Sequence, residues 1–99
     1  MRALDTNVLV RLLARDDLRQ TAAADAFVAP GAWVSHLVLA ETLWVLGSVY
    51  ERSPVQLAEA VELLLTHQSL AIQDADTVVA ALAHFKHKTA VGFSDCLVL

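Results

Sequence analysis

The segment Ala3-Leu4-Asp5-Thr6-Asn7-Val8-Leu9 carries the clearest secondary-structure pattern near the start of the chain. Ala3 and Leu4 predict a brief apolar strand that ends at Asp5, and Thr6 or Asn7 can cap a helix behind it. The apolar residues of that helix recur at helical spacing and form one face: Val8, Leu9, Leu12 and Leu13. The stretch therefore predicts a strand that passes directly into a helix, with an acidic residue at the junction.

The same alternation continues along the chain. Helices are expected at 18–28, at 36–50, after the start signal Ser53-Pro54-Val55-Gln56, and after a cap at Asp74 or Asp76. Short strands are expected at 32–35 and 70–72. Strands separated by helices favour an α/β fold of three layers, a central parallel sheet with helices on both faces. Ligands of such folds bind at the carboxyl ends of the strands, where Asp5 lies.

Composition limits the protein class. The chain has 99 residues, a net charge of −4 and 57% hydrophobic residues, which fits a single folded domain and excludes a disordered chain. No apolar run is long enough for a transmembrane helix, and Asp5 interrupts any signal peptide. The single cysteine, Cys96, excludes an internal disulfide, so we expect a cytoplasmic setting. The high apolar content also suggests surface that a partner covers.

Three acidic residues occupy positions that need an explanation. Asp5 follows the first strand, where a catalytic acid and a simple turn or cap aspartate are equally compatible with its position. Glu41 lies alone on an apolar helix, so its carboxylate must reach solvent, pair with a cation, take up a proton or bind a metal. Asp95 follows Gly92-Phe93-Ser94, and a helix cap also explains it. If the three converge, a divalent cation such as Mg²⁺ offsets their repulsion.

The sequence resembles the PIN domain family, and within it the VapC-like toxin ribonucleases. The resemblance rests on three blocks in order: Leu4-Asp5-Thr6-Asn7-Val8-Leu9, Ser35-His36-Leu37-Val38-Leu39-Ala40-Glu41, and Gly92-Phe93-Ser94-Asp95-Cys96-Leu97. It implies a Mg²⁺- or Mn²⁺-dependent endoribonuclease with Asp5, Glu41 and Asp95 as catalytic metal ligands. Thr6, Asn7 and Ser94 would support them.

The resemblance also implies partners and an extent. A PIN-like ribonuclease of this type acts on RNA, forms a homodimer and is held by a cognate antitoxin in a groove near the site. The family pattern continues with a further strand and a fourth acidic residue beyond Leu99. We therefore expect residues 1–99 to form one PIN-like domain that is C-terminally incomplete. The alternative function is a non-catalytic, truncated PIN-like module for dimerisation or partner binding.

The remaining polar candidates have simpler interpretations. His84 and His87 are three residues apart and could share a metal, but a solvated helix end with neighbouring lysines explains them better. His36 is interpreted as a hydrogen-bonded structural residue at a helix start. Cys96 is expected to be a small buried hydrophobe.

Two aromatic residues and three arginines complete the predictions. Trp33 and Trp44 are expected to pack in the core or in a dimer interface. Arg2, Arg11 and Arg15 could line the crevice and contact RNA phosphates, and ordinary surface arginines are an equally good interpretation.

Overall fold

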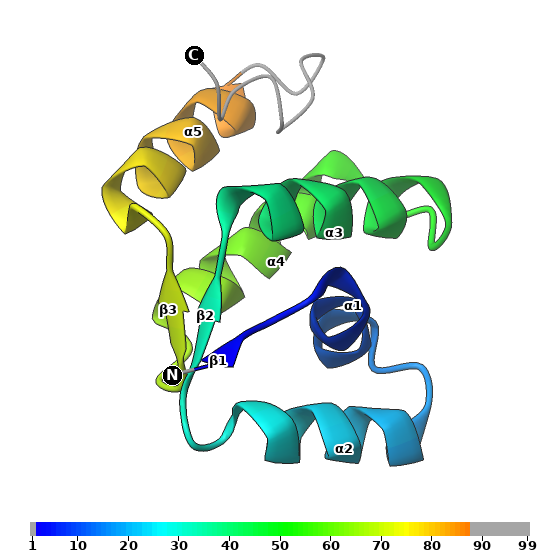
Figure 1. Cartoon of the computed structure of the whole chain (residues 1–99). Coiled ribbons are helices and arrows are strands. Elements are labelled where there is room, and N and C mark those ends of the chain that lie inside the picture. Colours follow the sequence, from blue (N-terminus) through cyan, green and yellow to red (C-terminus); the bar gives the residue numbers. More distant parts are fainter. Residues whose placement is uncertain (1, 88–99) are drawn as a thin grey trace.

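A small parallel sheet organises the chain. The computed structural model describes residues 2–87. Its three strands lie side by side in the order β1 (Arg2–Ala3), β2 (Ala32–Val34) and β3 (Leu70–Ile72), all parallel (Figure 1). In β2, Ala32 and Val34 are fully buried whereas Trp33 is 38% exposed, which is the alternation expected of a strand with one face on the core.

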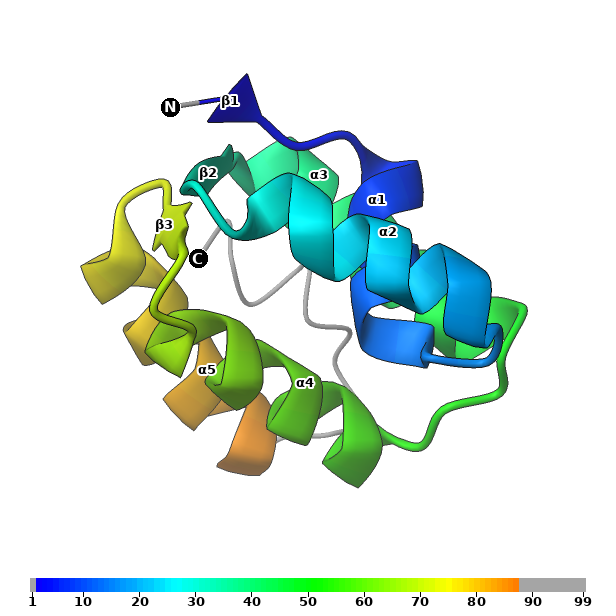
Figure 2. The same cartoon turned by 90° about the horizontal axis from the view of Figure 1, so that it is seen from below.

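Five helices surround this sheet within residues 2–87, and the fold is the predicted α/β type. They are α1 (Thr6–Ala14), α2 (Leu18–Val28), α3 (His36–Ser48), α4 (Pro54–Thr66) and α5 (Ala75–His87). Helix α1 packs against α2 and α3, whereas α4 packs against α5 and β3. Figure 2 shows α1 and α2 together on one side of the molecule and α4 with α5 on the other. In this part of the chain no helix has the length and apolarity needed to span a membrane.

The first junction differs in detail from its prediction. The strand is Arg2–Ala3, one residue earlier than expected, and Leu4 continues the ladder by donating its N–H to the Trp33 carbonyl at 2.8 Å. The helix cap is Asp5, not Thr6 or Asn7, because the Asp5 backbone is extended and its Oδ1 accepts the Val8 N–H at 3.0 Å. A carboxylate satisfies a first-turn amide well, so α1 begins one residue earlier.

The other predicted elements agree closely with the structure. The bounds of α2 and β3 are as predicted. The start signal at Ser53 forms a capping box, since the Ser53 N–H donates to Gln56 Oε1 at 2.8 Å and the Gln56 N–H donates to Ser53 Oγ at 3.2 Å. Gly31 adopts φ 104° in the turn before β2, a conformation that favours glycine. Of the two predicted caps for the last helix, Asp74 directly precedes it and Asp76 lies in its first turn.

Helix α3 is less covered than its apolar sequence predicts. One side packs inward through Leu39, Thr42, Leu43 and Leu46. The opposite side leaves Leu37 68% and Trp44 69% exposed, at helical spacing with Glu41 between them. The prediction of a helix buried on several faces is therefore wrong for this side. Trp33 of β2 and Trp44 of α3 are also not core residues, because their side chains are 38% and 69% exposed.

Candidate active site

The first carboxylate lies where the sheet meets α1. Asp5 follows β1 and Leu4, so its side chain is at the carboxyl end of the sheet, where parallel folds bind ligands. Its Oδ1 accepts the Val8 N–H, which fixes the carboxylate at the helix N-terminus. Asp5 is exposed. The cap interpretation of this residue is thus confirmed, and the same carboxylate still presents lone pairs to solvent.

The second carboxylate reaches the same place from α3. The Thr6 hydroxyl donates to Glu41 Oε2 at 2.8 Å, a contact between residues 35 positions apart in the chain. Since Thr6 directly follows Asp5, this hydrogen bond brings Glu41 to the first turn of α1. Glu41 is exposed, so of the possibilities left open for it, the carboxylate reaches solvent and accepts a hydroxyl. The predicted convergence of Asp5, Glu41 and Asp95 on one metal ion stays a prediction.

The N-terminus of α1 stabilises the negative charges of Asp5 and Glu41. A helix N-terminus carries partial positive charge, and its first amides are unsatisfied within the helix. Asp5 takes one of these amides, and Glu41 is held by the hydroxyl of the first helical residue. Each carboxylate uses only one of its oxygens in these bonds. Oxygen ligands of this kind suit Mg²⁺ or Mn²⁺, which keep several waters when bound.

Hydrogen bonds connect the residues that follow β2 and β3, at the start of the helix that carries Glu41. Ser35 caps α3 by accepting the Val38 N–H on its hydroxyl at 3.1 Å. The His36 N–H donates to Gln73 Oε1 at 2.9 Å, and His36 Nε2 lies 2.6 Å from the Gln73 carbonyl oxygen. A carbonyl only accepts, so Nε2 carries the proton. The interpretation of His36 as a structural residue is confirmed, and the contact fixes the start of the helix that carries Glu41.

Gln73 is the residue that sequence reasoning missed. Its side chain and carbonyl both bind His36, and its N–H donates to the Val34 carbonyl at 2.8 Å. The available signal was positional. Gln73 directly follows β3, and in a parallel sheet the residue after one strand lies beside the residue after its neighbour.

Several predicted residues are not brought to this pair by the described structure. Asp95, Ser94 and Cys96 lie outside residues 2–87, and so does the segment expected to precede a fourth acid. Within the described part of the chain, no group of three or more His, Cys, Asp or Glu side chains could hold a metal ion. Asn7 lies in the first turn of α1 and lines a groove toward α2.

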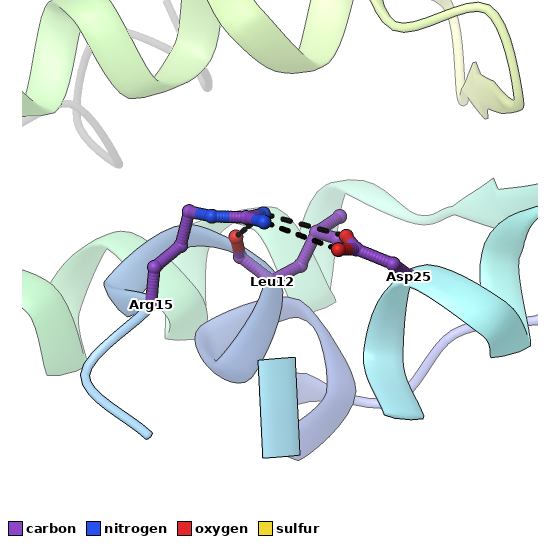
Figure 3. Close-up of polar contacts among 3 residues, drawn as sticks. All are labelled: Leu12, Arg15 and Asp25. Atoms are coloured by element: carbon purple, nitrogen blue, oxygen red, sulfur yellow. Dashed lines mark hydrogen bonds and ion pairs between the residues drawn. The ribbon is translucent and has the colours of Figure 1, made fainter. Parts of the chain in front are cut away.

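The three arginines have different surroundings. Arg15 binds Asp25 through two hydrogen bonds, of 3.3 and 3.1 Å, and also donates to the Leu12 carbonyl (Figure 3). Arg2 lies over the Phe27 ring at 4.1 Å from its centroid. Arg11 lines the groove that Asn7 also lines. For Arg15, the ordinary surface role is therefore the observed one.

Together these features define a parallel α/β domain with an acidic pair at the carboxyl edge of its sheet. The comparison with protein families identifies this class further. The family model described as PIN domain matches residues 2–99, and the chain belongs to that family. No curated protein and no solved structure matched the chain. PIN domains are generally nucleases, and a divalent metal and an RNA substrate are typical of them.

Proposed function

We propose that this chain is a Mg²⁺- or Mn²⁺-dependent endoribonuclease of the VapC type, with Asp5, Glu41 and Asp95 as its metal ligands. The observation that carries the proposal is the hydrogen bond from the Thr6 hydroxyl to Glu41, which holds the Glu41 carboxylate at the helix start that directly follows Asp5. Membership of the PIN family supports the reaction class. Asp95 enters through the family resemblance of its sequence block.

Each residue of the pair has a separate task in this proposal. Asp5 is oriented by the Val8 amide, so its second oxygen projects from a fixed helix start. Glu41 is oriented by Thr6 and faces solvent, where a phosphodiester can approach. A divalent cation, when bound here, supplies the positive charge that neutralises the phosphate and activates water. Asn7 and Ser94 are proposed to support the ligands, as the resemblance implies.

The proposed partners follow from the family and from one exposed surface. A cognate antitoxin, a homodimer and a cytoplasmic location belong to the VapC-type proposal. Leu37 and Trp44 are exposed on the side of α3 that carries Glu41, and large exposed apolar side chains favour a protein partner. The same exposure supports the second candidate function, a non-catalytic module that binds a partner or a second copy through α3.

Metal binding distinguishes the two functions. Titration of Mn²⁺ by calorimetry is expected to show binding to the wild-type chain and at least about tenfold weaker binding to Asp5→Asn and Glu41→Gln. Asp16→Asn removes the same charge from the loop before α2 and is the matched control, for which wild-type affinity is expected. Equal affinity in all four proteins would overturn the carboxylate site.

A cleavage assay completes the test. The chain is expected to cleave a mixed pool of single-stranded RNA with Mg²⁺ or Mn²⁺ and to stop on addition of a chelator. Cleavage that persists with chelator and in Asp5→Asn belongs to different chemistry and contradicts the proposal. A chain that neither binds Mn²⁺ nor cleaves RNA favours the non-catalytic module.

A further inference from the structure

An open groove lies between α1 and α2. It encloses about 320 Å³ and is lined by Asn7, Val8 and Arg11 of α1 and by Gln20, Ala24 and Phe27 of α2, among others. Asn7 directly follows Thr6, so the groove reaches the first turn of α1, the turn whose Thr6 hydroxyl binds Glu41. We propose that this groove holds a nucleotide of single-stranded RNA next to the carboxylates. The inference rests on the proposed nuclease function and adds its substrate path.

The charge of the groove favours an anionic occupant. None of the residues that line it is acidic, and Arg11 takes part in neither of the ion pairs found within residues 2–87. Arg2 adds a second guanidinium over the Phe27 ring. By contrast, the hollow between α4 and α5 is lined by Glu59 and Glu62 as well as a lysine. The chain as a whole is acidic, yet the groove between α1 and α2 is lined by an arginine and by no carboxylate.

The other lining groups fit the parts of a nucleotide. Val8 and Ala24 are half-buried and buried apolar side chains, which a flat base can cover. Phe27 offers an aromatic ring, and bases in single strands stack on such rings and on arginine planes. Asn7 and Gln20 each carry an amide with both donors and acceptors, as base edges require. Arg11 then meets a phosphate.

The amide groups and the location favour RNA over an acidic peptide. A peptide with apolar and acidic side chains would use the apolar lining residues and Arg11, but it gives no reason for the two side-chain amides, Asn7 and Gln20, in the lining. An RNA strand that passes the acidic pair must also continue along one of its sides. The groove offers one such continuation, because Asn7 of its lining lies in the same helical turn as Thr6.

The groove has fixed walls. The Arg15 guanidinium binds the Asp25 carboxylate through both of its oxygens and so joins the end of α1 to the last turn of α2 (Figure 3). Asp17 caps α2 by accepting the Gln20 N–H at 3.0 Å, which fixes the first turn of the α2 wall. A preformed site of this kind loses less entropy when a ligand binds.

Binding of a short labelled single-stranded RNA of mixed sequence, measured by fluorescence anisotropy in chelator, tests the groove without cleavage. Arg11→Gln is expected to weaken binding about tenfold, because a charged hydrogen bond is lost. Phe27→Leu keeps an apolar side chain, and we expect it to weaken binding about fivefold by removing the stacking ring. Arg19→Gln removes an equal charge from α2 outside the groove and is expected to change affinity less than about twofold.

Four results would overturn the proposal. The first is an equal loss of affinity in Arg11→Gln and Arg19→Gln, which shows that only overall charge matters. The second is unchanged RNA affinity in both groove variants. The third is an acidic, leucine-rich peptide whose binding depends on Arg11 and Phe27 when RNA binding does not, which assigns the groove to a protein. The fourth is normal metal-dependent cleavage in Arg11→Gln, which would contradict RNA binding in the groove and leave the proposed function intact.

Discussion

Two strands of the sheet are followed by an aspartate at the same offset, and the two aspartates have different surroundings. Asp5 stands two residues after β1 and Asp74 two residues after β3, each directly before a helix. Asp5 binds a backbone amide, while the neighbouring Thr6 hydroxyl extends across to Glu41. Asp74 instead accepts the hydroxyl of Thr77 from its own helix at 2.7 Å.

The two aspartates differ in backbone conformation and in the helix that packs beside them. Asp5 has an extended backbone, whereas Asp74 adopts φ 45°, a left-handed turn conformation. More important is the neighbouring helix. Helix α3 packs on α1 and brings Glu41 to its first turn, whereas α5 packs on α4. An acid at a strand end becomes part of an acidic pair only when a second element supplies a group at the same edge.

Replacement of Asp5 is expected to reduce catalysis strongly, whereas replacement of Asp74 is not. Asp5→Asn retains a good helix cap, so the fold is preserved while a charged ligand is lost. Its rate of metal-dependent RNA cleavage is expected to fall at least about 100-fold. Asp74→Asn is expected to remain within about twofold of wild type in the same assay. Similar losses in both variants would contradict the assignment of the site to the β1 end.

The two threonines give a finer test of the same comparison. Thr6→Val removes the hydroxyl that holds Glu41, and the affinity for Mn²⁺ is expected to fall about tenfold in a calorimetric titration. Thr6→Ser keeps the hydroxyl and is expected to restore binding. Thr77→Val removes the corresponding hydroxyl at Asp74 and should leave Mn²⁺ affinity unchanged. Wild-type affinity in Thr6→Val would mean that Glu41 needs no positioning.

A stability measurement separates capping from metal binding. Asp5→Ala removes the side-chain acceptor for the Val8 amide, so the free energy of unfolding in urea is expected to fall by about 1 kcal/mol. Asp5→Asn should lose much less. Asp74→Gly relieves the left-handed backbone while it loses the Thr77 hydrogen bond, and these effects are expected to cancel to within about 0.5 kcal/mol. A larger loss of unfolding free energy in Asp74→Gly than in Asp5→Ala would contradict the assignment of the stronger stabilising role to Asp5.

The smallest expected effect concerns the residue after Glu41. Thr42 is 0% exposed, and within residues 2–87 its Oγ1 has no hydrogen-bond partner. Thr42→Val replaces this hydroxyl with a methyl group of similar shape and is expected to raise the free energy of unfolding by about 0.5 to 1 kcal/mol. Thermal unfolding without metal measures it. A destabilised Thr42→Val protein would show that the hydroxyl is satisfied in solution.

Local patterns in the sequence predicted much of the fold. The capping box at Ser53, the bounds of α2 and the strand at 70–72 depend on neighbouring residues, so periodicity and cap residues were sufficient. The position of Asp5 directly before the first helix was also predicted from the change from strand to helix pattern at that residue. These features are set by spacing along the chain.

Other features depend on contacts between distant residues. The choice of Asp5 over Thr6 as the cap depends on where the extended backbone ends, because Thr6 already lies within α1 and its hydroxyl binds Glu41 of the neighbouring helix. The exposure of Leu37 and Trp44 depends on which side of α3 its neighbours cover, which apolar content alone does not reveal. The contact between His36 and Gln73 needs two strand ends in register. Asp95 and its block fall outside the described residues, so the third ligand stays a prediction.

The contact between His36 and Gln73 has a consequence for amide hydrogen exchange. Amides in the first turn of a helix have no acceptor within the helix and usually exchange rapidly with solvent. The His36 amide is different, because it donates to a side chain that follows β3. Its protection therefore reports on the end of β3 as well as on α3. The start of α3 and the end of β3 are expected to open in one cooperative step.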